Sequence, residues 1–358
     1  MALTTVRPQG MGFVTGRRNL IINGAMQVYQ RGASSSTSQG YVADRFRNEF
    51  SGAGVTTSRE TLSSGSPYDE GFRSFIRNSN TSVSSATSAY VYHVHLIEAQ
   101  NIANSGWQYT SASSYLTLQF WVRSSLAGTY YVLMETQDGS PNKTYSFTYT
   151  VSADTWTKVT HTFPGDSGIT INNDNGSGYR INFVAYLGTD FSTSGHTNEA
   201  WQTFSLSDLV GDFAQNWANT ASATFDITGV QLELGENASD FEHRSYGEEL
   251  SLCQRYFQQY KSAMCGTGDS STVLPVSFTG LVPMRASATI SSTGALQVTS
   301  YAIHSITQSS ASVTFADTAR DPQNASAYIY LNNFTGLETR TPYHLYNTTN
   351  YVTFDAEL

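Results

Sequence analysis

Residues 225–258 read FDITGVQLELGENASDFEHRSYGEELSLCQRYFQ, and this stretch decides the fold. Its first part alternates apolar and polar residues, with Gly229 where the alternation shifts, which predicts a buried strand containing a β-bulge. After a turn at 235–237 the apolar period changes from two to about three and a half residues. Ser245 followed by Glu248 has the spacing of a capping box, so a helix is predicted to begin there.

The predicted helix occupies 247–266 and connects two β modules. An apolar stripe repeats along it at intervals of three and four residues and consists of Leu250, Cys253, Phe257, Tyr260 and Met264. Such a stripe packs either on the chain's own core or against copies of the same helix. Packing on a sheet is favoured over a coiled coil, because two heptads are short and Gly266 ends the run.

The composition indicates a β-rich chain with a polar, weakly charged surface. Of 358 residues, 39% are hydrophobic and only 13% are charged, with 22 Tyr and 19 Phe. Ordinary soluble domains contain about 25% charged residues. Such a surface is typical of extracellular structural or glycan-binding β proteins. The net charge of −9 and the absence of a Lys/Arg cluster beyond Arg17-Arg18 argue against a nucleic-acid partner.

The sequence also bears on the compartment. It contains no run of about 18 apolar residues, so membrane insertion is not expected. The N-terminus lacks the basic start and apolar run of a signal peptide, and release by lysis as part of a virus particle is one route that needs neither. The two cysteines, Cys253 and Cys265, show no metal or disulfide spacing and are predicted to be free, mostly buried thiols.

The rest of the chain divides on either side of the predicted helix. Residues 1–16 contain three glycines and one proline but little apolar surface, which predicts an attachment arm. From residue 17 short apolar runs recur with turn signals between them, beginning with 19–29, a pattern typical of an all-β sandwich. We therefore predict a β-sandwich over 17–246 and a second, smaller C-terminal β-sandwich over 267–358.

The clearest strand, 115–124, contains candidate binding residues. Its apolar face consists of Leu116, Leu118, Phe120 and Val122. Alternation therefore places Trp121 and Arg123 on the polar face. Sugar recognition needs aromatic faces that stack on pyranose rings and planar polar groups that bond hydroxyls. Both residue types are present on this face.

We predict a carbohydrate-binding platform from five residues: Trp121, Arg123, Tyr186, His93 and His95. The two histidines alternate along their strand against Tyr90 and Tyr92. The competing interpretation is that the same side chains pack under loops or against another subunit.

A glycosidase needs two carboxylates roughly 5–9 Å apart to cleave a glycosidic bond. Asp44, Glu98 and Glu135 are candidates, but nothing in the sequence brings them together, and neither GxSxG nor HExxH occurs. Asp44-Arg45 and Glu98 are better interpreted as buried structural pairs or as groups that bond to turns. We therefore predict no catalytic residue.

Seven stretches of the chain follow one another in order, namely GRRNLIINGAMQVYQRG (16–32), YVADRF (41–46), IEAQNIA (97–103), LTLQFWVRSSLAGTY (116–130), TWTKVTHTF (155–163), FDITGVQLELG (225–235) and FEHRSYGEELSLCQRYFQ (241–258). Together they resemble tail-fibre-like and receptor-binding structural proteins of tailed, notably short-tailed, bacteriophages. The first module also resembles jelly-roll carbohydrate-binding modules, which begin near an Asn-Leu-x-x-Asn-Gly strand and end in a strand of the ITGVQLE type. The resemblance fades after residue 258.

The resemblance implies a jelly-roll first module and a non-enzymatic, tail-fibre-like adhesin of the virion that contacts host-envelope glycans. Its implied partners are copies of itself, typically three, and other virion proteins reached through the arm 1–16. The stripe from Leu250 to Met264 is the expected symmetric contact. Such modules sometimes hold a structural Ca²⁺, whose ligands the sequence does not identify. The alternatives are a capsid-attached head fibre or decoration protein with an assembly role, and a polysaccharide depolymerase.

Overall fold

The computed structural model describes residues 18–260, 262–279, 281–300, 306–307, 313–314, 326–346 and 350–358. The chain forms two compact units. Unit 1 comprises Met1–Met26, Ser36–Gln39 and Asn48–His243, and unit 2 comprises Gln27–Ser35, Gly40–Arg47 and Arg244–Leu358. The border between His243 and Arg244 lies close to the predicted division at 246, but two N-terminal segments belong to unit 2. The predicted arm 1–16 lies outside the described residues.

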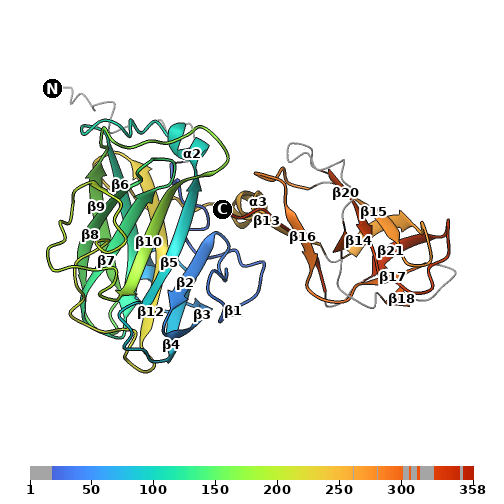
Figure 1. The fold of residues 1–358 in the computed structure, drawn as a ribbon, viewed down its shortest axis with the longest axis horizontal. Coiled ribbons are helices and arrows are strands. Elements are labelled where there is room, and N and C mark those ends of the chain that lie inside the picture. Colours follow the sequence, from blue (N-terminus) through green and yellow to red (C-terminus); the bar gives the residue numbers. More distant parts are fainter. Residues whose placement is uncertain are drawn as a thin grey trace, which may run out of the picture. The chain divides into compact units, whose positions relative to one another are not determined.

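Unit 1 is a β-sandwich of two sheets (Figure 1). The first sheet has the spatial order β3 (Gly54–Thr61), β4 (Ser74–Ser82), β12 (Thr224–Leu234), β6 (Tyr115–Ser124) and β9 (Thr157–Pro164). The second has the order β11 (Gln202–Thr203), β8 (Lys143–Val151), β7 (Gly128–Thr136), β10 (Ser177–Leu187), β5 (Tyr90–Glu98) and β2 (Phe46–Ser51). Short helices α1 (Ser66–Asp69) and α2 (Ala99–Ala103) occupy connections. The chain passes repeatedly between the sheets, which confirms the predicted jelly-roll sandwich.

The central strand β12 contains the predicted bulge. Its register with β6 shifts between Thr228 and Gln231, and Gly229 has a φ of 63°. A Cβ at this glycine would lie 2.8 Å from the ring of Phe72. Glycine is therefore needed both for the positive φ and for the close approach of an aromatic side chain.

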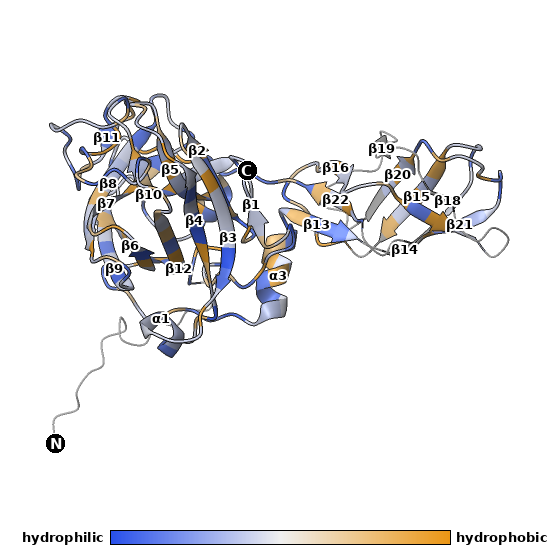
Figure 2. Cartoon of the chain, turned by 90° about the horizontal axis from the view of Figure 1, so that it is seen from below, coloured by the Kyte–Doolittle hydropathy of each residue, from blue (hydrophilic) through white to orange (hydrophobic). Residues whose placement is uncertain are grey.

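Alternation along the strands builds an aromatic core between the sheets, and Figure 2 shows the corresponding changes between blue and orange. Phe120 of β6 lies 5.0 Å from Phe183 of β10 and 5.4 Å from Tyr149 of β8, in edge-to-face geometry. Phe225 of β12 contacts Tyr130 of β7 at 5.6 Å. Each buried ring removes about 150–250 Å² from water, so these contacts between sheets stabilise the sandwich.

The predicted helix begins as expected but ends early. α3 (Tyr246–Gln254) is capped by Ser245, whose Oγ accepts a hydrogen bond from the Glu248 N–H at 3.3 Å. The chain then forms β13 (Phe257–Tyr260) and β14 (Ser262–Thr267), so the prediction of a helix over 247–266 is wrong. β13 pairs along its whole length with β22 (Val352–Asp355), and its aromatic residues suit a strand.

The predicted helical stripe is consequently not formed. Leu250 and Cys253 lie on α3, Phe257 and Tyr260 on β13, and Met264 on β14. Tyr260 packs edge-on against Phe278 and Phe354, at 5.6 and 5.9 Å. A symmetric contact through one helical face is therefore wrong in its geometry, and the trimer stays a prediction. The side chain of Met264 lies outside the described residues.

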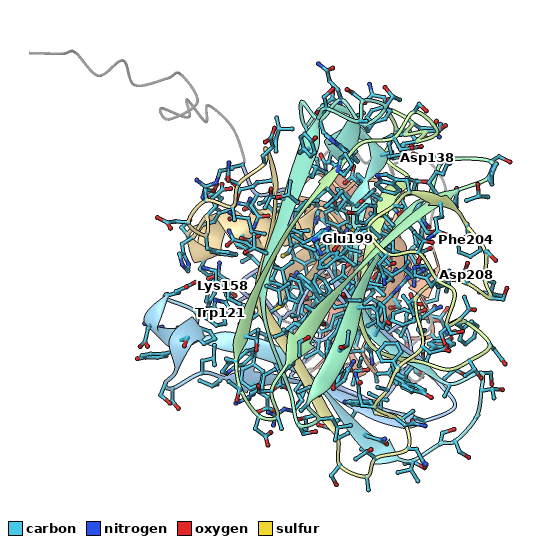
Figure 3. The ribbon with its side chains drawn as sticks, turned by 90° about the vertical axis from the view of Figure 1, so that its left-hand side faces the viewer. Trp121, Asp138, Lys158, Glu199, Phe204 and Asp208 are labelled. Atoms are coloured by element: carbon cyan, nitrogen blue, oxygen red, sulfur yellow. The ribbon has the colours of Figure 1, made fainter. Side chains whose placement is uncertain are left out.

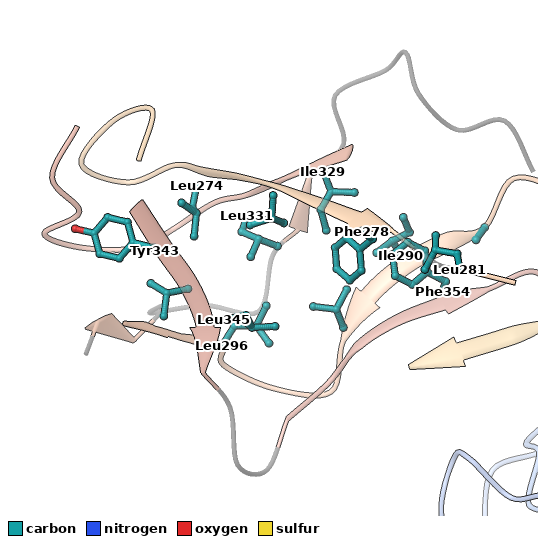
Figure 4. Packing of buried hydrophobic residues seen from close by; sticks show 14 of the residues in the cluster. Leu274, Phe278, Leu281, Ile290, Leu296, Ile329, Leu331, Tyr343, Leu345 and Phe354 are labelled. Atoms are coloured by element: carbon teal, nitrogen blue, oxygen red, sulfur yellow. The ribbon is translucent and has the colours of Figure 1, made fainter. Parts of the chain in front are cut away.

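Unit 2 contains the second β-sandwich. One sheet has the order β13, β22 and β16 (Thr289–Ser292). The other has the order β18 (Ile306–Thr307), β17 (Gln297–Thr299), β21 (Pro342–Tyr346), β14, β15 (Leu274–Thr279), β20 (Ser326–Leu331) and β19 (Val313–Thr314). The two-residue strand β1 (Ser34–Ser35) falls within the residues of unit 2 but is part of neither of these sheets. Figure 4 shows its apolar core, in which Leu274, Leu331 and Leu345 pack together and Phe278 lies 4.8 Å from Phe354.

Unit 2 also contains a buried ionic cluster, made of Arg31, Asp44, Arg45 and Glu357. Arg31 lies 3.6 Å from Asp44 and 3.1 Å from Glu357, and Arg45 pairs with the same Glu357. The rings of Phe257 and Tyr256 cover Arg31 and Arg45, at 3.6 and 3.5 Å from the guanidinium carbons. The predicted burial of Asp44 and Arg45 is confirmed, with the correction that Asp44 is paired with Arg31.

Candidate functional site

A pocket of about 230 Å³ opens on the outer face of the second sheet of unit 1. Three neighbouring strands, β5, β10 and β7, form its floor, and the segment 189–217, called the strap here, provides further walls. The lining residues are Tyr90, Tyr92, Leu133, Glu135, Asn182, Val184, Leu187, Phe191, Leu206 and Leu209. We call this pocket the groove. Its volume is smaller than the roughly 300–1,000 Å³ of sites for drug-sized ligands, so it suits one sugar-sized ring.

Two tyrosines provide the aromatic wall of the groove. Tyr90 and Tyr92 are two residues apart on β5 and so point to the same face. Their ring centroids lie 5.4 Å apart with planes 24° from parallel, and Phe191 of the strap meets Tyr90 edge-on at 5.8 Å. Rings held against one another in this way present a fixed apolar surface at low cost in conformational entropy.

A row of polar side chains crosses the same face beside the tyrosines. Asn182 donates from Nδ2 to Glu135 Oε1 at 2.7 Å and accepts from Arg180 Nε at 2.6 Å. Arg180 Nη2 donates to Glu49 Oε2 at 2.9 Å, and the Tyr92 hydroxyl donates to the same oxygen at 3.0 Å. The network fixes each planar group in one orientation, as a site for hydroxyl groups requires.

Electrostatics in this row follow from burial. Desolvation raises the pKa of Glu135, and the Arg180 guanidinium and the Asn182 hydrogen bond oppose that rise. Burial, followed by the charge of Glu49, raises the pKa of Tyr92, which therefore keeps its hydroxyl proton. Glu135 supplies acceptor oxygens, whereas Tyr92, whose hydroxyl proton is donated to Glu49, supplies its ring.

The strap is fastened to the sheet by a chain of side-chain contacts. His196 Nε2 lies 2.6 Å from Ser146 Oγ of β8, and His196 Nδ1 lies 2.7 Å from Asp208 Oδ1. Ser146 Oγ also donates to Asn198 Oδ1 at 3.0 Å, and the Glu199 N–H donates to the Ser146 carbonyl at 2.7 Å. The strap carries Phe191, Leu206 and Leu209 into the groove, so these contacts position its wall.

The order Ser146, His196, Asp208 matches the order of contacts in a serine-hydrolase triad. The burial of these side chains argues against serine-hydrolase chemistry here. Ser146 is only 1% exposed and lies outside the groove lining, while the His196 side chain is 2% exposed. A nucleophile must reach its substrate, so we interpret this chain of contacts as a fastening of the strap.

Trp121 and Arg123 lie on the outer face of the first sheet, as predicted, but this face is covered at Trp121. Trp121 is 7% exposed, packs with Phe72 and donates from Nε1 to Glu70 at 3.1 Å. Arg123 bonds Asp226 at 2.9 Å and lies over the Trp156 ring at 4.7 Å. Figure 3 shows Trp121 and Lys158 on one side of unit 1 and Phe204 and Asp208 of the strap on the other.

The other predicted platform residues do not join them. His93 and His95 are 0% and 1% exposed and point into the core, because their register partners Phe183 and Ile181 face inward. Burial lowers the pKa of His93 to about 3, so this imidazole is neutral. Tyr186 lies at a β-bulge of β10, half-buried and 5.6 Å from Phe213. The structure therefore does not bring the five predicted residues into one site, and the two histidines offer no surface to a ligand.

The candidate carboxylates also lie apart. Asp44 belongs to unit 2, whereas Glu98 is fully buried at the end of β5 and bonded to Gln100. Only Glu135 lines the groove. Within the described ranges no group of three His, Cys, Asp or Glu side chains is placed to hold a metal ion, and a structural Ca²⁺ stays a prediction.

The predicted state of the cysteines is tested at one of the two positions. Cys253 is free and buried, as predicted. The side chain of Cys265 lies outside the described residues. None of the described helices is long and apolar enough to cross a bilayer.

The two tyrosines of the groove could have been recognised from the alternation of their strand. In AYVYHVHLI (89–97) the tyrosines and histidines occupy opposite faces, and the platform was predicted from the histidine face. Glu49, Arg180 and the strap had no comparable signal, because their contacts join different elements that lie far apart along the chain. Glu49 and Arg180 are 131 positions apart, and His196 and Ser146 are 50 positions apart.

No family model and no curated protein matches the sequence. Among solved structures, the chain is similar to the enzymatically active domain of tailspike protein 4 of bacteriophage CBA120, with 14% identity, a TM-score of 0.34, 61% of this chain and 21% of that chain covered. The N-terminal cellulose-binding domain of a Cellulomonas fimi β-1,4-glucanase has 14% identity and a TM-score of 0.26, with 46% and 80% covered.

A tandem CBM22 domain of Paenibacillus barcinonensis is similar at 10% identity and a TM-score of 0.29, covering 93% of this chain and 99% of that one. The chain spans about a fifth of the length of the tailspike domain. At these identities the likenesses concern the β-sandwich alone.

Proposed function

We propose that this chain is a non-enzymatic structural protein of a tailed-phage particle, a tail-fibre-like adhesin whose unit 1 binds host-envelope glycan in the groove. One observation carries the binding role: the stacked Tyr90–Tyr92 pair lies beside Glu135 and Asn182 in one sugar-sized pocket. Rings for C–H faces and fixed planar groups for hydroxyls are the two requirements of sugar recognition.

The sequence resemblance supports placement on a virion. Three of the matching stretches, 16–32, 41–46 and 241–258, contribute Arg31, the Asp44-Arg45 pair and the rings of Tyr256 and Phe257 to one buried cluster of unit 2. The arm 1–16 is proposed to attach the protein to other virion proteins. A trimer would multiply weak sugar contacts through multivalency. The alternative of a head fibre or decoration protein is distinguished by locating the protein on intact particles with a labelled antibody.

A depolymerase is the second candidate, because burial raises the pKa of Glu135 as a general acid would require. Against it, the Arg180 guanidinium lies between Glu135 of the groove and the neighbouring Glu49, with Nε 3.7 Å from Glu135 and Nη2 2.9 Å from Glu49. A glycosidic bond would need that space. We expect no release of reducing sugar from host envelope by the full chain, and release abolished by Glu135→Gln would favour the enzyme.

Glycan-array binding of the full chain tests the proposed site. We expect binding to bacterial-envelope oligosaccharides, weakened at least tenfold by Tyr92→Ala and less than threefold by Tyr92→Phe, which keeps the ring. Trp156→Ala is the matched control, since Trp156 is a half-buried ring that packs against Phe75 and Arg123 of the other sheet. Thermal unfolding checks that all variants fold. Binding that survives Tyr92→Ala and is lost in Trp156→Ala would reject the groove as the site.

A further inference from the structure

The lining of the groove is largely apolar, and this restricts the class of sugar that it can bind. The inference rests on the glycan-binding function proposed above. Beside the two tyrosines and Phe191, the lining contains five aliphatic side chains: Leu133, Val184, Leu187, Leu206 and Leu209. Its other polar groups are Glu135 and Asn182. Pyranose hydroxyls meeting so much aliphatic surface would lose hydrogen bonds to water without replacement.

The polar and apolar parts of the groove are separated along the strands. On β10 the outward side chains change from Arg180 and Asn182 to Val184, and after the bulge to Leu187. On β7 Glu135 is followed by Leu133 on the same face. The groove therefore has a polar end that accepts hydroxyl hydrogen bonds and an aliphatic end that does not.

The strap completes the aliphatic end. Leu209 is 8% exposed and packs with Val184 and Leu187, whereas Leu206 is 58% exposed at the rim. An exposed leucine at the rim of a pocket gains burial when an apolar ligand group covers it. At the polar end the Glu135 carboxylate has acceptor sites beyond the one used by Asn182.

We propose that the groove binds a single sugar residue that carries a methyl group, with the methyl against Leu187, Leu206 and Leu209 and the ring hydroxyls donating to Glu135. The methyl belongs either to a 6-deoxyhexose or to an acetyl substituent, since both present the same apolar group. A pocket of this kind is expected to discriminate by about 10- to 100-fold against the hydroxylated counterpart.

Matched sugar pairs test the inference on the full chain. Array oligosaccharides ending in L-fucose and L-galactose differ only in the hydroxyl at C6, and those ending in N-acetylglucosamine and glucose test the acetyl source. We expect at least tenfold tighter binding of the methyl-bearing member in one pair. Leu206→Ser is expected to reduce that preference at least threefold, and Leu234→Ser, at a 49% exposed leucine outside the groove, to leave it unchanged.

The outcomes separate this inference from the proposed function. Binding that is sensitive to Tyr92→Ala but equal within both pairs, or stronger for the hydroxylated members, overturns the methyl site and leaves glycan binding standing. A preference unaffected by Leu206→Ser also overturns it. Absence of binding to every envelope glycan overturns the proposed function and this inference together.

Discussion

The groove of unit 1 and the ionic cluster of unit 2 are built from the same kinds of side chain. In each, arginine lies among carboxylates and against aromatic rings. Arg180 contacts Glu49 and Glu135 and lies 5.5 Å from Tyr92. Arg31 contacts Asp44, Asp355 and Glu357 and lies 3.6 Å from Phe257. The difference is what lies beside the charges. The groove row borders a pocket, whereas the arginines of the unit 2 cluster lie against the rings of Phe257 and Tyr256.

That difference assigns the two arrangements different roles. In unit 2 the charges of the cluster pair with one another, and Arg285 nearby donates to the backbone carbonyls of Ala356 and Glu357. Their effect is on the stability of the unit, since an uncompensated buried charge is costly. In the groove, Glu135 and Tyr92 still face a cavity that a ligand can fill. An arginine–carboxylate–ring motif alone therefore does not identify a binding site.

The largest expected effect is on unit 2. Arg45→Met leaves Glu357 without one of its buried cationic partners, and we expect a loss of about 3–5 kcal/mol in the free energy of unfolding. Urea unfolding of the full chain measures it, while glycan binding is expected to be unchanged.

The matched variant in the groove is Arg180→Met. Its side chain is 17% exposed, so we expect a loss of only about 1–2 kcal/mol in stability together with at least tenfold weaker glycan binding. Equal losses of stability in both variants, with binding intact in both, would remove the distinction between the two clusters.

The stability of unit 1 is expected to depend on pH. His93 has a folded pKa of about 3 against 6.5 when unfolded, so its contribution to stability is present above pH 6.5 and is lost as the pH falls towards 3. Between pH 7 and pH 5 we expect a loss of roughly 2 kcal/mol in the free energy of unfolding. In His93→Met this part of the loss should disappear. An unchanged pH slope in the variant would show that the imidazole is not the cause.

The smallest effect concerns the strap. His196→Ala removes the contacts to Ser146 and Asp208, and we expect glycan binding about three- to tenfold weaker, or about 1 kcal/mol, because the wall carrying Leu206 and Leu209 is less well positioned. His243→Ala is the control, since His243 contacts the Glu70 carbonyl at 2.9 Å outside the groove. Equal binding in both variants would contradict a positioning role.

Much of the fold could be predicted because its signals are local. Alternation in 225–234 and 115–124 predicts β12 and β6, Gly229 predicts the bulge, and Ser245 predicts the start of α3. The end of α3 could not be predicted, because pairing of β13 with β22 joins residues about 100 positions apart. The run 19–29 could not be told from a strand by its sequence for a related reason. Leu20, Ile21, Ile22, Met26 and Val28 are buried without forming a strand, and Leu20 instead donates its backbone N–H to Leu232.

The site was less predictable than the fold. Periodicity placed Trp121 on the outer face correctly, but only the three-dimensional structure shows that Phe72 and Glu70 cover it. Periodicity also places Tyr92 and His93 on opposite faces of their strand, but it does not show which of the two faces points outward. That information lies in the packing of His93 against Phe225 of the opposite sheet.

Glycan binding in the groove is tested most directly by a crystal structure of the full chain with the oligosaccharide that binds it most tightly on the array. We expect one sugar residue in the groove, stacked on Tyr90 or Tyr92 and donating a hydroxyl hydrogen bond to Glu135. Sugar density over Trp156, or on unit 2, with the groove left empty would contradict it.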